Sequence, residues 1–261
     1  MTNLFAEELT IAYDNEVIVD RLNLRFSPGE ITAIIGPNGC GKSTILKTMA
    51  RLQPSQSGAV YLDGKLIHKT PSKEIAKKMA ILPQSPDAPE GLSIYELISY
   101  GRTPYQSGFS RLTTHDCEMI EWALRVTGLS SIQHQPVDTL SGGQRQRAWI
   151  AMAIAQETNL LMLDEPTTYL DPAHQLEVLT LLEKLNKEEG RTIVMVIHDL
   201  NHAARFAHHL VALKQGKVIK EGTAEQVMNA EVLKEVFTID TEIITDPRTG
   251  KPAMISYDLI K

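Results

Sequence analysis

The order of apolar and polar positions predicts a chain in which short strands alternate with helices. In LNLRF, residues 22–26, every second side chain is apolar, which is typical of a strand with one buried face. ITAII (31–35) and LLMLD (160–164) are almost wholly apolar and predict buried strands. Residues 172–189 predict a helix, with Asp171 as its N-cap and Gly190 at its C-terminal end. This alternation favours an α/β fold with a mostly parallel sheet.

A shift in composition marks a second region. Proline and glycine cluster in residues 83–93, and helical patterns follow over residues 93–101 and 117–129. We therefore predict an inserted helical subdomain over residues 86–155. Residues 1–85 and 156–261 then form the core, which we expect to end in a hairpin that turns at residues 247–250.

Charge and composition exclude some classes of function. The 26 basic and 32 acidic residues give a net charge of −6, and only 5% of the residues are aromatic, so we expect no nucleic-acid partner. The apolar residues 149–155 belong to a run that is well short of the roughly 18 residues that a membrane-spanning helix needs. The two cysteines suggest no disulfide framework and fit a reducing compartment.

The segment GPNGCGKST, residues 36–44, carries the most specific chemistry in the sequence. It matches GxxxxGK[ST] and lies between a predicted strand and a predicted helix. Glycines let backbone N–H groups close around phosphate oxygens, and the helix adds the positive end of its dipole. Lys42 then reaches the β- and γ-phosphates, and the Ser43 hydroxyl binds Mg²⁺. The predicted nucleotide-binding residues are Gly36, Pro37, Asn38, Gly39, Cys40, Gly41, Lys42, Ser43 and Thr44.

Polar side chains follow three more predicted strands. Asp164 and Glu165 end one strand; we predict that Asp164 holds Mg²⁺ and that Glu165 orients and polarises an attacking water. Gln84 is a candidate ligand of both Mg²⁺ and that water, and His198 a candidate contact of the γ-phosphate. Taken singly, each also fits an ordinary polar strand end. Together with Gly36 they follow the carboxyl ends of strands, where open α/β sheets bind ligands.

The stretch LSGGQRQR, residues 140–147, follows no predicted strand and lies inside the predicted helical subdomain. Ser141 fits a helix N-cap, and Gly142 and Gly143 expose backbone N–H groups. The residues therefore suggest a second anion site apart from the first. An ordinary capped helix explains them as well.

Taken together, these residues resemble the ATP-binding subunits of ABC transporters, and the resemblance covers essentially the whole chain. It implies a P-loop NTPase core with an N-terminal antiparallel β subdomain and an inserted helical subdomain. It also implies ATP and Mg²⁺ as ligands and ATP hydrolysis coupled to transport. The features that carry it are, in chain order, Tyr13, residues 36–44, Gln84, LSGGQ, LLMLDE, Asp171 and His198.

The resemblance also implies partners. Two subunits pair head to tail, and the ATP held by one is covered by Ser141, Gly142, Gly143 and Gln144 of the other. Such a pair works at the cytoplasmic face of the cell membrane, bound to integral membrane permease subunits that a substrate-binding protein serves.

Two further roles follow from the resemblance. Tyr13 stacks on adenine, which its position before the first strand pair favours over packing on the sheet. Asp171 caps its helix and also belongs to the loop that meets the opposing site.

Two stretches are similar to one group within the family. Residues 100–113 and 164–175 resemble those of ferric-siderophore and cobalamin importers, so we expect uptake of an iron(III)-siderophore or a related metal chelate. A cobalamin or haem importer, or a soluble ATPase such as an iron–sulfur assembly factor, is the alternative. Residues 100–113 fit either a docking surface for the permease or a solvated loop. Cys40 fits a small packed residue better than a redox-sensitive thiol.

Overall fold

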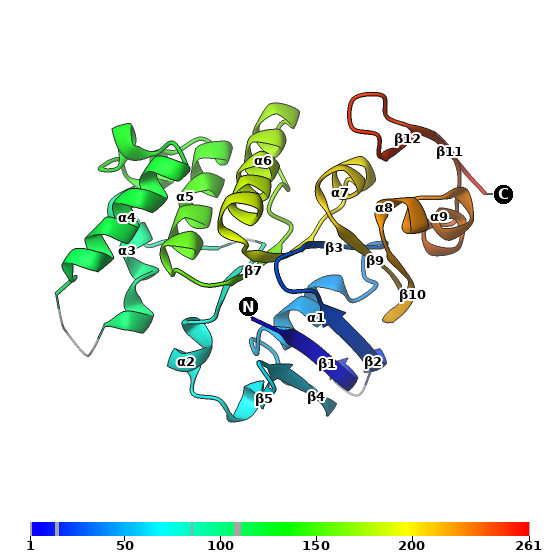
Figure 1. Cartoon of the computed structure of the whole chain (residues 1–261), viewed down its shortest axis with the longest axis horizontal. Helices are drawn as coiled ribbons and strands as arrows, with labels where there is room; N and C mark the ends of the chain where they lie inside the picture. Colours follow the sequence, from blue (N-terminus) through cyan, green and yellow to red (C-terminus); the bar gives the residue numbers. More distant parts are fainter. Residues whose placement is uncertain (1, 14–15, 85, 107–110, 261) are drawn as a thin grey trace. The chain divides into compact units, whose positions relative to one another are not determined.

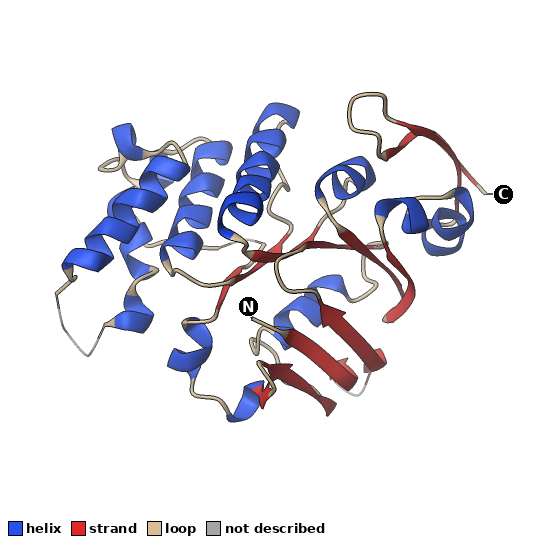
Figure 2. Cartoon of the chain, in the orientation of Figure 1, coloured by secondary structure: helices blue, strands red, loops and turns tan. Residues whose placement is uncertain are grey.

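The structure is a computed structural model, and it describes residues 2–13, 16–84, 86–106 and 111–260. The chain forms two compact units, Met1–Lys69 with Thr192–Lys261, and Thr70–Arg191. Figure 1 shows their elements in chain order, and Figure 2 shows them by type. The helical subdomain predicted over residues 86–155 falls inside the second unit, and its exact limits stay a prediction.

The first unit contains an antiparallel sheet in the order β2-β1-β4-β5. β1 and β2 pair so that Leu4 faces Phe26 and Ala6 faces Leu24, and all four side chains are buried. The alternation in residues 22–26 therefore does mark a strand with one buried face. The strands are β1 (Leu4–Tyr13), β2 (Glu16–Phe26), β4 (Ser57–Leu62) and β5 (Lys65–Leu66).

A second sheet segment in this unit is mostly parallel. β3 (Ile31–Ile35) lies between β8 (Thr192–Val196) and β9 (His209–Lys214) and runs parallel to both. Every residue of β3 and β8 is buried, which explains their apolar sequences. β10 (Lys217–Gly222) pairs with β9 in the antiparallel sense. Helices α1 (Lys42–Met49) and α7 (Leu200–Phe206) follow β3 and β8 in the chain.

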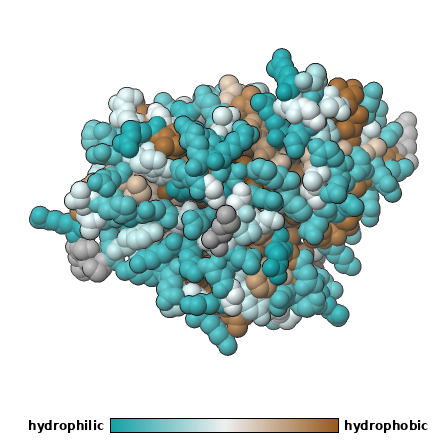
Figure 3. Space-filling model, in the orientation of Figure 1, coloured by the Kyte–Doolittle hydropathy of each residue, from teal (hydrophilic) through white to brown (hydrophobic). Residues whose placement is uncertain are grey.

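The C-terminal part of the first unit ends in the predicted hairpin. β11 (Ile239–Thr245) pairs with β12 (Pro252–Leu259) after two short helices, α8 (Ala224–Val227) and α9 (Ala230–Phe237). Asn201 of α7 holds β12 by donating to the Met254 carbonyl and accepting from its N–H. Tyr257 and Leu259 are largely exposed on this hairpin. On the face drawn in Figure 3 most residues are hydrophilic, and the apolar ones form separate patches.

The second unit combines two parallel strands with a group of helices. β6 (Met79–Leu82) pairs with β7 (Leu160–Asp164), and α3, α4 and α5 contact one another (Figure 1). α6 ends at Gly190 in the left-handed conformation, as its sequence predicts. The helices are α2 (Ser72–Ala76), α3 (Ile94–Tyr100), α4 (Thr114–Val126), α5 (Gly142–Ala155) and α6 (Pro172–Glu189).

Two sequence-based expectations change in detail. Tyr13 does not precede the first strand pair; it is the last residue of β1 and lies inside that pair, opposite Glu16. α4 begins three residues before the predicted Cys117, because Thr113 and Asp116 form a capping box. Among the described residues, no helix has both the length and the apolarity needed to cross a membrane.

A buried arginine that follows α3 joins α4 to the end of α5. Arg102 is 1% exposed; its Nε donates to Asp116 Oδ1 at 2.8 Å, and a guanidinium nitrogen donates to the Ala155 carbonyl at 2.8 Å. Burial opposes ionisation of Asp116, but hydrogen bonds from Thr113 and Arg102 outweigh it and lower its pKa. The ion pair therefore contributes stability above the pKa of this carboxyl and loses it as the pH falls through that value.

We expect Arg102→Met to lower the free energy of unfolding by about 3–5 kcal/mol at pH 7, because it leaves the Asp116 carboxylate buried without its cation. Urea unfolding monitored by circular dichroism measures the change. The difference in the free energy of unfolding between the variant and wild type should narrow as the pH falls, because protonation of Asp116 removes the buried charge. Arg125→Met, at an exposed position of α4, is the matched control. An equal and small effect of both substitutions at pH 7 would contradict the prediction.

Candidate functional site

The loop after β3 has the geometry that its sequence predicts. β3 ends at Ile35, residues 36–41 form the loop, and α1 begins at Lys42. Gly36, Gly39 and Gly41 all have positive φ, and Gly41 caps α1 in the left-handed conformation. Such a strand–loop–helix turns backbone N–H groups and the positive end of a helix toward one place. It can hold an anion such as a phosphate chain.

Gly36 occupies a position where no side chain fits. A Cβ built on it would lie 2.3 Å from the Leu213 carbonyl oxygen of β9 and 2.8 Å from Cys40 Sγ. Its φ of 153° adds backbone strain for any other residue. The loop therefore depends on a glycine here so that its backbone can pass against β9.

Lys42 folds its side chain over the same loop. It is 5% exposed, and its Nζ donates to the Gly36 carbonyl at 2.8 Å and to the Pro37 carbonyl at 3.0 Å. The ammonium is thus held at the mouth of the loop by neutral acceptors, which a phosphate oxygen can replace with a charged one. Ser43 and Thr44 follow in the first turn of α1 and are half-buried.

The Cys40 side chain is buried rather than exposed to solvent. It is 4% exposed, and burial raises the pKa of its thiol in spite of the nearby Lys42. A protonated, buried thiol is a poor nucleophile. This supports the interpretation of Cys40 as a small packed residue, and its redox behaviour stays untested.

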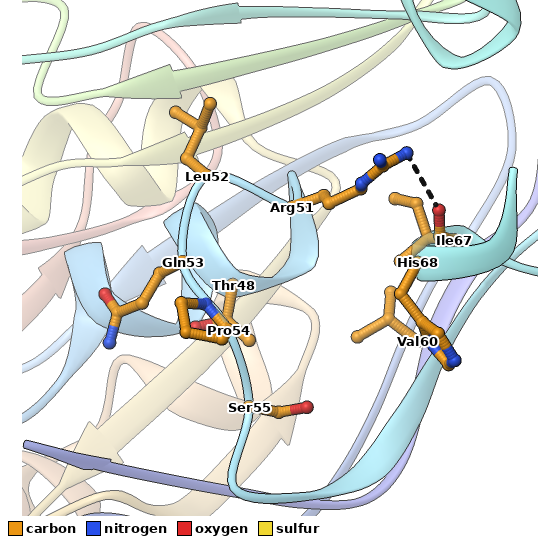
Figure 4. A pocket seen from close by; sticks show the side chains of 9 residues that line it. All are labelled: Thr48, Arg51, Leu52, Gln53, Pro54, Ser55, Val60, Ile67 and His68. Atoms are coloured by element: carbon orange, nitrogen blue, oxygen red, sulfur yellow. Dashed lines mark hydrogen bonds between the residues drawn. The ribbon is translucent and has the colours of Figure 1, made fainter. Parts of the chain in front are cut away.

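Tyr13 has a polar partner that the sequence did not reveal. Its hydroxyl donates to Gln53 Oε1 at 2.5 Å, while the side chain stays about half exposed. Gln53 lines a hollow of about 310 Å³ beyond α1, shown in Figure 4, where Arg51 donates to the Ile67 carbonyl. The hydrogen bond restrains the hydroxyl end of the side chain, and the half-exposed ring can offer a face to a planar group.

His198 lies two residues beyond β8, as predicted, and is exposed. Asp199 beside it caps α7 by accepting the His202 N–H at 2.7 Å. Both residues line an open hollow of about 700 Å³ together with β12 of the hairpin. The imidazole can therefore reach a ligand near the end of β8.

In the second unit, the structure brings Gln84 and Glu165 together. Gln84 follows β6 and Glu165 follows β7, and Gln84 Nε2 donates to Glu165 Oε2 at 2.5 Å. Thr168 donates to the same oxygen at 2.9 Å. Glu165 has φ 55°, which costs backbone energy for a non-glycine residue and is often found at functional sites. The hydrogen bonds from Gln84 and Thr168 thus orient the Glu165 carboxylate.

Asp164 is the last residue of β7 and is 1% exposed. A carboxylate buried to this degree requires polar or charged neighbours that offset its lost hydration. The described residues contain no cluster of three or more His, Cys, Asp or Glu side chains that holds a metal by itself. The predicted Mg²⁺ ligands, Ser43, Gln84 and Asp164, carry the hard oxygen donors that Mg²⁺ prefers, and their assembly into one site stays a prediction.

Ser141 caps α5, as predicted. Its Oγ accepts the Gln144 N–H at 3.3 Å, and Gln144 Oε1 accepts the Ser141 N–H at 3.0 Å. Gly142 and Gly143 form the first turn, where helix N–H groups lack intrahelical partners. The capped-helix interpretation is therefore correct, and the anion site remains compatible with it.

Asp171 caps α6, again as predicted. Its Oδ1 accepts the His174 N–H at 3.0 Å, and its Oδ2 lies 2.7 Å from His174 Nδ1. The hydrogen bond from the His174 backbone, with help from the ring, lowers the pKa of Asp171. The sequence identifies residues 164–175 only by their similarity to one group of the family, and it does not reveal that Thr168 and His174 contact Glu165 and Asp171.

The predicted docking stretch, residues 100–113, is only partly described, because residues 107–110 lie outside the described residues. Before them, Tyr100 is 52% exposed, and residues 103–105 form a 3-10 turn over buried Arg102. The choice between a docking surface and a solvated loop stays open.

Comparison with known proteins places these features in a family. The ABC transporter family model matches residues 19–168. The iron(3+)-hydroxamate import ATP-binding protein FhuC of Bacillus subtilis (strain 168) is 64% identical over 261 residues, which cover 100% of this chain and 97% of that protein.

Solved structures agree with this. A chain of a metal-chelate-type ABC transporter in an inward-facing conformation aligns with a TM-score of 0.84 at 27% identity, covering 97% of this chain and 96% of that one. The ATP-binding cassette MJ0796, described as a dimer bound to ADP and phosphate, aligns with a TM-score of 0.73 at 29% identity over 84% of this chain and 98% of its own. The fold, the loop around Lys42 and these similarities lead to one conclusion: the chain belongs to the ATP-binding subunits of ABC transporters.

Proposed function

We propose that this chain binds and hydrolyses ATP to drive import of an iron(III)-hydroxamate siderophore through a separate membrane permease. The observation that carries the proposal is the 64% identity to the Bacillus subtilis hydroxamate-import subunit over the whole of this chain. A substrate-binding protein and the permease select the siderophore, while this subunit supplies the energy. Its place is then the cytoplasmic face of the membrane.

In this proposal the nucleotide lies along the loop after β3. The loop N–H groups and Lys42 bind the phosphates, and Tyr13 stacks on adenine. Ser43, Gln84 and Asp164 would hold Mg²⁺, which supplies positive charge to the β- and γ-phosphate oxygens. His198 contacts the γ-phosphate. The loop geometry and the hydroxyl anchor of Tyr13 on Gln53 support these roles.

Glu165 is the proposed catalytic residue. Its carboxylate orients the attacking water and accepts its proton as the water attacks the γ-phosphorus. The bond from that phosphorus to the β–γ bridging oxygen breaks, which releases ADP and phosphate. The hydrogen bonds from Gln84 and Thr168 to Oε2 fix the carboxylate plane. Because Gln84 donates to Glu165 through Nε2, its Oε1 is the atom that would bind Mg²⁺, so Gln84 would couple occupancy of the site to the orientation of Glu165.

Two copies then close head to tail over two ATP molecules. The N–H groups of Gly142 and Gly143, with Ser141 and Gln144, bind the γ-phosphate held by the partner subunit. Asp171 meets the opposing site from the loop before α6. ATP acts as the link that holds the pair closed, and hydrolysis reopens it.

The glycine requirement at Gly36 gives a first test. Gly36→Ala should lower ATP affinity by about 10- to 100-fold, because the new Cβ must push the loop away from the Leu213 carbonyl. Titration calorimetry with a non-hydrolysable ATP analogue measures it. Gly64→Ala is the control, since Gly64 also has a positive φ, of 74°, but a Cβ added there would meet no described atom within 4 Å. Equal affinities for all three proteins would refute the assignment of the loop.

Glu165→Gln gives a second test. We expect ATP affinity within about twofold of wild type and a hydrolysis rate lower by about 10²- to 10⁴-fold, because an amide cannot accept the proton. Phosphate release by the purified chain measures turnover. Glu118→Gln, an exposed change on α4, should leave the rate unaltered. Normal steady-state hydrolysis by Glu165→Gln would remove Glu165 from the mechanism.

The substrate is tested in cells. Iron-starved cells that lack this gene should lose uptake of radio-iron from hydroxamate siderophores and keep uptake from catecholate siderophores. Wild-type protein should restore uptake, and Glu165→Gln should not. Unchanged hydroxamate uptake in the deletion strain would overturn the substrate assignment while leaving the ATPase chemistry intact.

A further inference from the structure

The start of α5 packs directly against the loop that precedes α6. A Cβ built on Gly143 would lie 2.5 Å from Cδ2 and 2.7 Å from Cγ of the His174 ring, closer than real Cβ contacts occur. One on Gly142 would lie 3.7 Å from Leu170 Cδ2, an ordinary contact distance. Gly143 is buried in the first turn of a helix, so helical backbone geometry does not itself require glycine. The His174 ring excludes a side chain there.

The ring is itself held in place by the loop. Both carboxylate oxygens of Asp171 are engaged with residue 174, one with its N–H at 3.0 Å and one with Nδ1 at 2.7 Å. Gln175, the next residue, donates from Nε2 to the Leu170 carbonyl at 3.0 Å and to the Thr167 carbonyl at 3.4 Å. The first turn of α6 thus fixes both the loop at residues 167–171 and the ring that meets Gly143.

A second contact between the two helices lies one turn further on. Arg147 of α5 forms an ion pair with Glu177 of α6. This contact joins the same helices but touches neither Asp171 nor the ring. It therefore separates general packing of α5 on α6 from the contact at Gly143.

We propose that His174 is a positioning residue that locks residues 141–144 to the loop at residues 167–171, so that both elements offered to the partner subunit's nucleotide move as one body. The inference rests on the proposed head-to-tail dimer. His174 touches no nucleotide. Its hydrogen bond to Asp171 ties it to the loop, and its contact with Gly143 fixes the direction of the N–H groups at the start of α5.

The test measures closure separately from nucleotide binding. In the full chain carrying Glu165→Gln, ATP and Mg²⁺ should produce a dimer seen by size-exclusion chromatography with light scattering. Adding His174→Ala should weaken this dimerisation by about tenfold, the scale of a coupled contact. The affinity of the monomer for an ATP analogue and the melting temperature should stay near those of the parent. Glu177→Ala, the matched control, should dimerise like the parent.

A suppressor experiment tests the steric part. Gly143→Ala should strongly impair dimerisation while His174 is present, and Gly143→Ala combined with His174→Ala should recover to the level of His174→Ala alone. An equal defect of Gly143→Ala with and without the ring would overturn the inference, as would parental dimerisation of His174→Ala. Failure of the Glu165→Gln parent itself to dimerise with ATP would instead overturn the proposed dimer.

Discussion

The close passage of the loop after β3 along β9 constrains much of the first unit. With no side chain at Gly36, the backbone lies against the Leu213 carbonyl, and the loop can turn its N–H groups inward before α1 begins. β3 supplies the rigid base, because it is buried in full and paired in parallel on both sides. Packing density leaves such a contact little freedom, since interiors have few gaps that can absorb an added methyl group.

The sequence predicted those features that depend on a single stretch of chain. Almost wholly apolar blocks identified β3 and β7, because a strand buried on both faces admits few polar residues. The caps of α5 and α6 were also predictable, since Ser141 and Asp171 act on N–H groups three residues away.

Contacts between distant stretches were not predictable in the same way. Tyr13 and Gln53 are 40 residues apart, and Gln84 and Glu165 are 81 apart, so only tertiary packing brings them together. The position of Tyr13 was misjudged because nothing in its flanks shows that β1 extends to it. The sequence also predicts that one edge of the sheet carries Gly36, Gln84, Glu165 and His198. These residues belong to both units, so this placement stays a prediction. The sequence gives one weak indication of the contact between Gly143 and His174: a glycine stands at position 143, where no turn requires one.

The loop between β7 and α6 concentrates backbone strain. Glu165 and Tyr169 both adopt positive φ although neither is glycine, and Tyr169 is 90% exposed. Such conformations persist only where the surroundings hold them. Here Thr168 bonds to Glu165, and Gln175 bonds to the carbonyls of Thr167 and Leu170. The residues that mark kinship in this stretch are thus the ones that hold its shape.

The buried ammonium of Lys42 has a thermodynamic consequence. Because folding of the chain leaves this group 5% exposed, the ammonium loses most of its hydration during folding. A phosphate that replaces the Gly36 and Pro37 carbonyls then gains a charge-assisted bond without removing a hydration shell from the lysine. The cost of this dehydration lowers the free energy of unfolding of the subunit and does not lower its affinity for a phosphate. The subunit is therefore less stable than its packing alone would make it.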